Sequence, residues 1–583
     1  MRCEMKESER GDGLKLSGNA VEILLKRYLS RDGSGMVSET PAEMFERVAS
    51  HISLAEVRHG GDAEVMRSKF FKMMAGLEFL PNSPTLMNAG LPLGQLSACF
   101  VLPVEDSLPG IFEALKSMAL IHQSGGGTGF SFSRLRPRGD VVRATGGVAS
   151  GPVSFMGIFD RATEVIKQGG RRRGANMGVL RVDHPDIMEF IQAKQRPGVL
   201  ENFNISVAAT DEFMRAAGQG RDIDLVNPRT GLAQSRINAQ EIMNEIANCA
   251  WRGGDPGMIF IDRINALHPL PGIIESTNPC GEQPLLAYES CNLGSINLSK
   301  LVKDGEMDWQ RLEELISLAV RFLDDAIDVN RYPLKVIEET TLLSRKIGLG
   351  VMGFADMLIL RGISYGSPEA VQAAEVVMRF ISDAARRASC NLGLLRGSFP
   401  LFEQSLFASW PAMRNATVTT VAPTGTISII AGTSSGIEPL FAVAFVRRAL
   451  EGARLFEVSP LFERAAEARG IYTTGLMEQL ARKGSVQGLA GVPQDLQELF
   501  VTALDIPPEQ HIRIQAAFQK YTDNAVSKTV NLPETSTVDD VLRVFYQAFD
   551  SGCKGVTVFR YGCRSQVLYV GNGETVPGCK YCG

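Results

Sequence analysis

The sequence predicts an α/β protein with largely parallel strands, and two observations carry this prediction. Short runs rich in β-branched residues, such as ISVAAT and MIFIDR, alternate with helical patterns near 236–250 and 309–329. Such alternation is typical of parallel sheets, because parallel neighbours need long crossover connections that are usually helical. Hydrophobic residues make up 44% and charged residues 21% of the 583 residues, which indicates an ordinary globular chain.

The charge and cysteine content exclude several classes of protein. The chain has 60 basic and 65 acidic residues, so no basic excess points to nucleic acid or to an anionic membrane. The opening residues, MRCEMKESERGDG, contain no apolar run like that of a signal peptide, and no stretch of 18 apolar residues suggests a membrane helix. We therefore expect a cytoplasmic protein whose ten cysteines are buried thiols, metal ligands or redox catalysts rather than structural disulfides.

Three regions follow one another along the chain. Residues 1–80 are expected to be helical, because apolar positions recur at spacings of three and four from about residue 19, as in NAVEILLKRYL. Residues 81–560 carry the α/β alternation. Residues 561–583 lose this periodicity, and we expect them to form a flexible tail.

The α/β region begins with a turn-rich stretch, followed by two helices and two glycine-rich loops. A turn-rich stretch at 80–104 ends in a short apolar strand candidate. Two amphipathic helices are expected at about 108–123 and 152–168, because their apolar residues share one face. Glycine-rich loops lie after the first helix and at the end of the second, SGGGTG at 124–129 and KQGGRRRGANMG at 167–178.

One cysteine has chemically suggestive neighbours. Cys280 lies in Asn-Pro-Cys-Gly-Glu at 278–282, where Pro279 and Gly281 rule out a regular helix. In an extended backbone, side chains two and four residues apart face the same way. The Asn278 amide, the Cys280 thiol and the Glu282 carboxylate would then project together, although an inert buried cysteine in a tight turn fits this pentapeptide equally well.

Two more cysteines and two possible phosphate loops accompany this pentapeptide. Cys99 ends the SAC segment, and Cys291 follows Cys280 in SCNLGSINLS. The loops GGGTG at 125–129 and PTGTIS at 423–428 offer backbone N–H groups and hydroxyls that can bind phosphate. Each loop taken alone is more often a plain turn.

A dense, ordered set of motifs makes the sequence resemble the ribonucleotide reductase family from about residue 20 to the C-terminal cysteines. These motifs are NSPTL (82–86), SACF (97–100), GGGTG (125–129), RRGANMG (172–178), NPCGE (278–282), CNLGSINL (291–298), APTGTIS (422–428) and GVTVFRYG (555–562). The resemblance implies a ten-stranded α/β barrel made of two five-stranded parallel halves. It also implies a central finger loop that carries the reactive cysteine.

The chemistry that the resemblance implies is the radical-based reduction of ribonucleotides to 2′-deoxyribonucleotides for DNA synthesis and repair. Cys280 would be the thiyl radical that abstracts the 3′-hydrogen of the ribose. Glu282 would accept the 3′-hydroxyl proton as general base, and Asn278 would hydrogen-bond the substrate hydroxyls. The 2′-hydroxyl would leave as water, with a proton and electrons from a dithiol of Cys99 and Cys291 that ends as a disulfide.

The resemblance also implies the substrate contacts and the route of the electrons. Cys579 and Cys582 would form a redox pair that exchanges with the internal disulfide and takes electrons from a thioredoxin- or glutaredoxin-type reductant. The motifs leave diphosphate and triphosphate substrates open, although the dimer-type helices favour a diphosphate. The residues expected to contact the ribonucleotide are Ser83, Ala98, Cys99, Gly127, Asn278, Pro279, Cys280, Gly281, Glu282, Pro423, Thr424, Gly425, Thr426 and Ile427.

The source of the radical follows from which class of the family the sequence resembles. Iron- or manganese-dependent members relay the radical through two adjacent tyrosines near the C-terminus, whereas Tyr561 and Tyr569 stand apart here. Anaerobic members carry a glycyl-radical site of RVxGY type, which this sequence lacks. The resemblance is therefore to the adenosylcobalamin-dependent class, whose cobalt–carbon bond supplies the radical. Cys563 stands where a serine is common in that class, and no metal site built from side chains is expected.

Regulation by a nucleotide is implied at the two amphipathic helices, which in this family pack against a twin subunit as a four-helix bundle. A deoxynucleotide or ATP would bind at this homodimer interface and control substrate specificity alone, because no further N-terminal regulatory domain is apparent. A solvated basic patch is the plain alternative for the arginines at 171–173. The residues that match the effector site are Asp106, Ser107, Lys167, Gln168 and Arg172.

Two other functions fit single motifs. Residues Gly348–Gly353 read GLGVMG, a literal GxGxxG that would mark an NAD-dependent dehydrogenase if a strand preceded it and a helix followed. Cys579 and Cys582, with Cys553 and Cys563, would form a zinc ribbon only if both pairs were closely spaced, and the second pair is ten residues apart.

Overall fold

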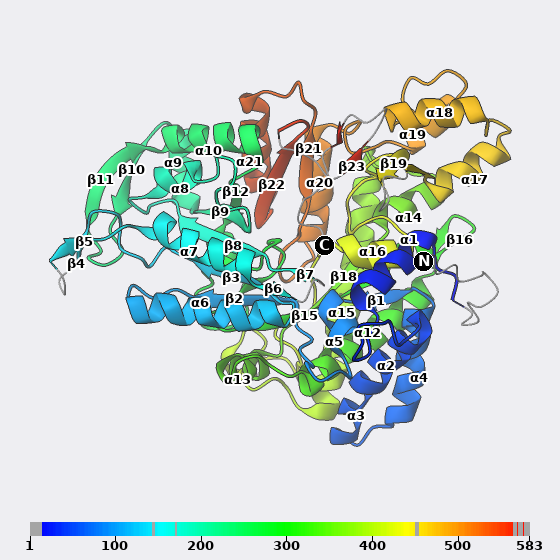
Figure 1. Ribbon diagram of the computed structural model, residues 1–583, viewed down its shortest axis with the longest axis horizontal. Coiled ribbons are helices and arrows are strands. Elements are labelled where there is room, and N and C mark those ends of the chain that lie inside the picture. The colour runs from blue at the N-terminus through cyan, green and yellow to red at the C-terminus, as the bar shows by residue number, and fades with distance from the viewer. Residues whose placement is uncertain are drawn as a thin grey trace.

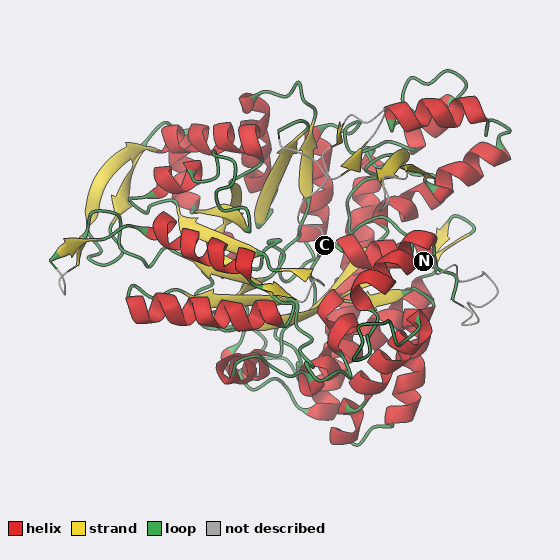
Figure 2. Cartoon of the chain, viewed as in Figure 1, coloured by secondary structure: helices red, strands yellow, loops and turns green. Residues whose placement is uncertain are grey.

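The computed structural model describes residues 14–142, 146–168, 172–448, 454–563, 568–569 and 575–576. A central sheet, yellow in Figure 2, is surrounded by helices, and helices from the N-terminal region cover one end of the molecule (Figures 1 and 2). In these described ranges no helix has both the length and the apolar character that a membrane crossing requires.

The N-terminal region is helical, as the sequence predicts. Its elements are α1 (Gly18–Ile23), the π-helical turn η2 (Leu24–Tyr28), α2 (Pro41–Ser53), α3 (Ala55–Arg58) and α4 (Ala63–Ala75). Thr40 fixes the start of α2, because its hydroxyl accepts from the Glu43 N–H while the Glu43 carboxylate accepts from the Thr40 N–H. The buried faces of η2, α2 and α4 share one apolar core with α12 (Trp309–Val329) and α15 (Pro368–Arg396).

A mixed sheet of ten strands forms the centre of the molecule. Its order is β1 (Phe79–Pro81), β15 (Ser290–Asn297), β2 (Cys99–Pro103), β3 (Gly127–Ser131), β8 (Asn176–Arg181), β9 (Phe203–Ala209), β12 (Gly257–Phe260), β22 (Gly555–Arg560) and β21 (Thr529–Leu532), with β18 (Ile347–Met352) also paired to β15. The strands from β2 to β12 are parallel, as are β15 with β18 and β21 with β22. Antiparallel pairs join β1 to β15, β15 to β2 and β12 to β22.

Single parallel bridges continue this order beyond β18. Leu349 pairs with Thr419, and Val421 pairs with Val526, which lies just before β21. The Leu349 N–H donates to the Val418 carbonyl at 2.8 Å, and the Val421 N–H donates to the Ala525 carbonyl at 3.1 Å. The segment 417–421 therefore lies between β18 and the chain that enters β21, as a further parallel neighbour of both.

The remaining helices surround the sheet. They are α5 (Ser83–Asn88), α6 (Leu108–Gln123), α7 (Pro152–Val165), α8 (Ile187–Gln192), α9 (Asp211–Gly218), α10 (Ala239–Gly253), α11 (Ile261–Ala266), η3 (Leu298–Leu301), α13 (Lys335–Ser344), α14 (Phe354–Leu360), η4 (Phe402–Gln404), α16 (Gly425–Ala431), α17 (Pro460–Ala468), α18 (Thr474–Lys483), α19 (Gln494–Leu499), α20 (Pro508–Gln519) and α21 (Val538–Asp550). A second large core packs α6, α7, α10 and α21 against the sheet.

Short strands form smaller sheets around this centre. They are β4 (Val141–Val142), β5 (Gly147–Val148), β6 (Lys167–Gln168), β7 (Arg172–Arg173), β10 (Asp222–Val226), β11 (Ala233–Asn238), β13 (Ser276–Thr277), β14 (Pro284–Leu285), β16 (Val302–Lys303), β17 (Glu306–Met307), β19 (Ala444–Arg448), β20 (Arg454–Val458), β23 (Leu568–Tyr569) and β24 (Thr575–Val576). The last two pair with each other, and β23 pairs with β19, so part of the expected tail is regular strand.

The two predicted amphipathic helices are confirmed as α6 and α7, with one correction. The second helix ends at Val165, three residues earlier than expected. The reason is that Lys167 and Gln168 leave the helix to form β6, which pairs with Arg173 and Arg172 of β7.

Candidate active site

A hairpin carries the predicted reactive cysteine. Strands β13 and β14 pair antiparallel, and the Asn278 N–H closes the tip by donating to the Gln283 carbonyl at 3.1 Å. The Gly281 N–H donates back to the Asn278 carbonyl at 3.1 Å, and Gly281 has the positive φ of 84° that this turn requires. The tip is therefore a turn, and the extended backbone considered for 278–282 is wrong.

The turn separates the three predicted side chains by exposure. Cys280 is exposed at the tip, whereas Asn278 and Glu282 are buried. The Asn278 amide is held in place because its Oδ1 accepts from the Gln283 N–H at 2.9 Å, which leaves its Nδ2 to donate to Cys99 Sγ at 3.1 Å. The hairpin tip thus touches the cysteine of β2 through Asn278.

Contacts from both sides of the sheet fix the hairpin. Asn204 on β9 donates its Nδ2 to the Pro279 carbonyl at 2.8 Å. On the other side, the Glu282 carbonyl accepts from the Ala525 N–H and from the Thr420 hydroxyl, each at 2.9 Å. The hairpin tip is therefore held by hydrogen bonds from β9 and from the segment 417–421, together with Ala525.

The glycines of GGGTG make room for this hairpin. A Cβ on Gly129 would lie 1.7 Å from the Thr277 carbonyl oxygen, and one on Gly127 would lie 2.8 Å from Pro279 Cγ. Both glycines belong to strand β3. The interpretation of GGGTG as a phosphate-binding turn is therefore wrong, because these glycines serve the close approach of two backbones.

The GxGxxG motif has the same explanation. Gly348 and Gly350 lie inside strand β18, and a Cβ on Gly350 would lie 2.3 Å from the Thr420 carbonyl oxygen. A dinucleotide fingerprint needs its glycines in the turn between strand and helix. Only Gly353, at the start of α14, is placed there. The geometry excludes the dehydrogenase alternative.

Cys99 and Cys291 lie directly opposite each other across the antiparallel pair of β2 and β15. Opposed Cα atoms in such a pair are roughly 4.5–5.5 Å apart, which falls within the span of a disulfide. The two side chains are 3% and 1% exposed, and they share a small apolar cluster with Leu285 of the hairpin. Burial raises the pKa of the Cys291 thiol, so this cysteine is protonated at neutral pH.

The loop at 423–427 lies at the end of the segment 417–421. This segment runs parallel to β18 and hence to β15, which is antiparallel to β2. The segment therefore ends at the edge of the sheet at which β2 and β3 begin. Cys99 and Gly127 are the first residues of these two strands. Thr424 caps α16 with a φ of 55°, and its Oγ1 accepts from the Gly436 N–H at 2.7 Å.

Two other predicted substrate residues lie at this side. The Ala98 N–H donates to the Cys291 carbonyl at 3.2 Å, and the Ala98 carbonyl accepts from the Gly127 N–H at 2.9 Å. Ser83 begins α5 directly after β1, and its hydroxyl is 2.7 Å from the Tyr28 hydroxyl.

The predicted effector residues are not brought together within one chain. Arg136 donates to both oxygens of Asp106, and Ser107 caps the start of α6 by accepting from the Gly110 N–H. Gly174, just after β7, instead packs against His122 near the end of α6. The helix has 16 residues and spans ~24 Å, so the two groups lie at its opposite ends. The side chains of Lys167, Gln168 and Arg172 lie outside the described structure.

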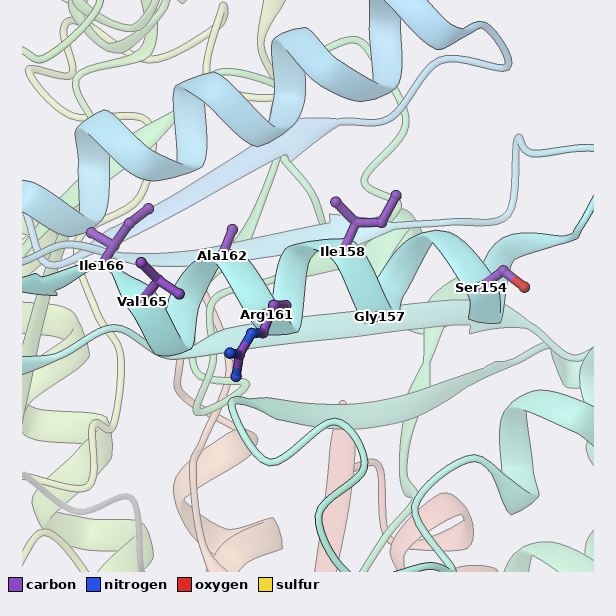
Figure 3. A pocket seen from close by; sticks show the side chains of 7 residues that line it. All are labelled: Ser154, Gly157, Ile158, Arg161, Ala162, Val165 and Ile166. Carbon is purple, nitrogen blue, oxygen red and sulfur yellow. The ribbon is translucent and has the colours of Figure 1, made fainter.

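The outer face of α7 carries an open apolar hollow (Figure 3). Its lining residues all belong to this helix or follow it directly: Ser154, Gly157, Ile158, Arg161, Ala162, Val165 and Ile166. Neighbouring apolar side chains on α6 are also exposed, with Phe112 at 50% and Leu108 at 62%. This surface is the one for which the sequence predicts a twin subunit.

The zinc-ribbon alternative loses one of its four ligands. Cys553 is fully buried in the apolar core, where burial raises its pKa to about 12. Across the described ranges, no group of three or more potential ligands gathers to hold a metal ion. Cys579 and Cys582 lie outside the described residues.

Sequence reasoning missed a set of buried charges beside the dithiol. Lys346 and Glu289 are both buried, and Lys346 Nζ lies 2.5 Å from Glu289 Oε2 and 2.8 Å from His268 Nε2. No motif includes Lys346. The available signal was a lysine directly before the apolar run IGLGVM, where a buried strand would force it to find a partner.

Comparison with known proteins first defines the class of protein. The ribonucleotide reductase all-alpha domain matches residues 14–94, and the ribonucleotide reductase barrel domain matches residues 97–410 and 411–559. The chain therefore belongs to the ribonucleotide reductase family. This confirms the family predicted from the motifs, and it confirms a helical domain followed by an α/β domain.

Individual relatives narrow the comparison. The vitamin B12-dependent ribonucleoside-diphosphate reductase of Thermoplasma acidophilum is 50% identical over 629 residues, covering 97% of this chain and 81% of the relative. A Mycobacterium tuberculosis protein of the same name is 52% identical, covering 96% and 81%. The class Id ribonucleotide reductase alpha subunit of Actinobacillus ureae shares the fold, with a TM-score of 0.77 at 23% identity, covering 94% of this chain and 97% of that one.

Proposed function

We propose that this chain catalyses the vitamin B12-dependent reduction of ribonucleoside diphosphates to 2′-deoxyribonucleoside diphosphates, a reaction that supplies DNA synthesis and repair. The observation that carries the proposal is the contact of the hairpin tip with the opposed cysteines, made by Asn278 Nδ2 on Cys99 Sγ. The relatives at 50% and 52% identity bear the corresponding name and support both the cofactor and the diphosphate.

The fold proposed for this activity is a closed ten-stranded barrel of two five-stranded parallel halves. One half is β2, β3, β8, β9 and β12, and the other is β15, β18, the segment 417–421, β21 and β22. The halves meet in antiparallel pairs at β2–β15 and β12–β22, and the bridges at Thr419 and Val421 support the closure. In this barrel β1 is an extra strand on β15, and the β13–β14 hairpin is the central finger loop.

Each residue of the site has a role in the proposed reaction. The Cys280 sulfur radical takes the 3′-hydrogen of the ribose, Glu282 accepts the 3′-hydroxyl proton, and Asn278 orients the hydroxyls. The 2′-hydroxyl leaves as water. Cys99 and Cys291 supply two electrons and two protons and become a disulfide; one proton leaves in the water and the other ends on the 2′-carbon. The 3′-hydrogen then returns from Cys280.

Adenosylcobalamin supplies the initiating organic radical when it is bound. The thiols fit such a group because they differ in access: Cys280 alone is exposed among the cysteines within the described ranges, whereas Cys99 and Cys291 are buried. A bulky cofactor can therefore approach the Cys280 sulfur without reaching the dithiol. The buried surroundings of Asn278 and Glu282 keep water away from the substrate hydroxyls.

The substrate phosphates are proposed to bind at Pro423–Ile427, where backbone N–H groups at the start of α16 are free of intrahelical partners. Ser83, Ala98 and Gly127 would contact the rest of the nucleotide. Turnover would be renewed through Cys579 and Cys582, which would pass electrons from a thioredoxin- or glutaredoxin-type dithiol to the internal disulfide. The reducing cytoplasm is the compartment that suits these thiols.

A homodimer is proposed for the regulatory site. The exposed apolar residues of α6 and α7 would pack on a second copy, and a twofold axis places the same face of both copies in contact. If the α6 helices pack antiparallel, Asp106 and Ser107 of one copy lie near Lys167, Gln168 and Arg172 of the other. This arrangement would join two half-sites for a deoxynucleotide or ATP effector that controls substrate specificity.

Purified protein with adenosylcobalamin, dithiothreitol and a ribonucleoside diphosphate is expected to form the deoxyribonucleotide. Omission of the cobalamin should abolish product, and addition of a metal-containing second subunit should not replace it. Activity that needed such a subunit would contradict the proposed class. The corresponding triphosphate, tested in parallel, should give a lower kcat/KM than the diphosphate.

A further inference from the structure

Lys346 occupies a defined place in the sheet beside the buried cysteines. Asn292 on β15 is paired with Ile347 on β18, so the preceding residues, Cys291 and Lys346, are also lateral neighbours. Paired positions on adjacent strands project from the same face of a sheet. Cys99 is the neighbour of Cys291 on its other side. The three residues thus form one row across three strands, with Cys291 in the middle.

Hydrogen bonds strengthen this juxtaposition. The Cys291 thiol donates to the Lys346 carbonyl at 3.6 Å. The Lys346 side chain is 0% exposed, and its ammonium is paired with Glu289 Oε2 at 2.5 Å. Glu289 precedes Cys291 by two residues on the same chain, and its Oε2 also accepts from the Leu286 N–H at 2.7 Å. A buried cation is therefore locked next to the dithiol by a carboxylate that is itself fixed to the finger hairpin.

Among the ionisable groups around this row, Lys346 is the cation whose charge lowers the pKa of Cys291. His268 faces the ammonium with Nε2, and its pKa is lowered to about 3 by burial and by Lys346, so it is neutral. Lys554 directs its ammonium to the carbonyls of Asp523 and Asn524. The acids that act on Cys291 are Glu289 and Glu282, which raise its pKa, while Lys346 lowers it.

We propose that Lys346 is the charge-compensating residue for the Cys291 thiolate that leaves when the internal disulfide is reduced. This inference rests on the proposed role of Cys99 and Cys291 as the reducing dithiol. Without a nearby cation, expulsion of a thiolate into a buried, apolar site would be slow, because the leaving group is a poor one when its pKa is high.

The chemistry balances as an ordinary exchange with an external dithiol. A reductant thiolate forms a bond to Cys99 Sγ, the Cys99–Cys291 bond breaks, and its electron pair stays on Cys291 Sγ, where the positive charge of Lys346 would stabilise it. The second reductant thiolate then attacks the reductant sulfur of the mixed disulfide and releases the Cys99 thiolate. Both protein thiolates take up protons, and the reductant ends as its own disulfide.

The test measures disulfide reduction alone, so it requires neither cobalamin nor nucleotide. The full chain carrying C579S and C582S is oxidised with diamide, and reduction by dithiothreitol is followed by alkylation and mass spectrometry of Cys99 and Cys291. Lys346→Met is expected to slow reduction about tenfold, and Lys346→Arg, which keeps the charge, to stay within about threefold. If diamide forms no Cys99–Cys291 bond, the dithiol of the proposed function fails together with this inference.

A double variant separates charge compensation from simple structural support. Glu289→Gln with Lys346→Met removes both buried charges and leaves no unpaired acid. Charge compensation predicts that the Cys99–Cys291 disulfide of this variant is also reduced about tenfold more slowly than that of the parent. A reduction rate within about twofold of the parent rate, either for Lys346→Met alone or for the double variant, would overturn the proposal.

A second measurement uses the oxidised parent protein, so it does not depend on whether a variant folds. It determines which of the two cysteines forms the mixed disulfide with glutathione. Glutathione is expected to form its mixed disulfide on Cys99, with Cys291 as the free thiol. A mixed disulfide mainly on Cys291 would overturn the proposal, because the leaving thiolate would then be the one remote from Lys346.

Discussion

Cys291 has 1% of its surface exposed, whereas Val165 on the outer face of α7 has 67%. Around Cys291, two contacts are made within the same chain: Asn278 donates to Cys99, and Lys346 pairs with Glu289. Around Val165, apolar side chains face solvent along an open hollow (Figure 3). The difference supports the proposal that one chain assembles the chemistry, whereas two copies together form the regulatory site.

The largest expected effect tests whether the inner region depends on one exposed thiol. Cys280→Ser should abolish turnover, because an alcohol cannot carry the radical that a thiol does. Product formation with adenosylcobalamin and dithiothreitol checks this. Cys390→Ser is the matched control, since Cys390 is half-buried outside the site and its replacement should leave turnover unchanged. Residual turnover in the Cys280 variant would remove this residue from the mechanism.

A second change tests whether the hairpin needs its glycine neighbour. Gly129→Ala places a Cβ 1.7 Å from the Thr277 carbonyl, so the hairpin or β3 must move. A displacement of about 1 Å in a reacting group costs on the order of 100-fold in rate, and we expect kcat to fall at least that far. Gly475→Ala, at the second residue of α18, meets no other atom within 4 Å and should leave kcat unchanged. Equal kcat for Gly129→Ala and wild type would refute the close approach.

A smaller effect concerns the pH dependence of the buried charges. The unfolded chain protonates His268 near pH 6.5, whereas burial and Lys346 lower its folded pKa to about 3. Between these values the unfolded state binds more protons, so the free energy of unfolding falls as pH falls. Since each pKa unit corresponds to about 1.4 kcal/mol, the free energy of unfolding falls by about 2 kcal/mol from pH 7 to pH 5. Urea titrations should show that His268→Gln lessens this loss, and an unchanged pH slope would contradict the prediction.

The smallest effect belongs to the outer face. Val165→Asp places a carboxylate on the apolar hollow of α7 and should weaken self-association about tenfold or more, because the charge would be buried in the dimer. Sedimentation at several protein concentrations measures the change. Leu232→Asp is the control, since Leu232 is 69% exposed in the loop between β10 and β11, outside α6 and α7, and its replacement should not alter the association. A stable dimer in the Val165 variant would move the interface elsewhere.

The sequence alone determined the family, the helical first domain and the candidate thiols. Ordered motifs specify these because each is local: Pro279 and Gly281 exclude a helix around Cys280, and the apolar spacing of 108–123 predicts the helix that the structure shows. The sequence left the extended and the turn conformation of 278–282 open. It also misled locally, since GGGTG and GLGVMG look like phosphate turns. Local patterns cannot distinguish a glycine that binds a ligand from one that lets another strand pass.

Only the tertiary structure decided which distant residues meet. The register of β15 sets Cys291 between Cys99 on β2 and Lys346 before β18, and no spacing along the chain contains that information. The same holds for Asn204 and Thr420, which hold the hairpin from two sides of the sheet. Strand pairing joins residues that are far apart in sequence, so these neighbours follow from the order and direction of whole strands. The sequence therefore supplied the reactive groups, and the sheet supplied their partners.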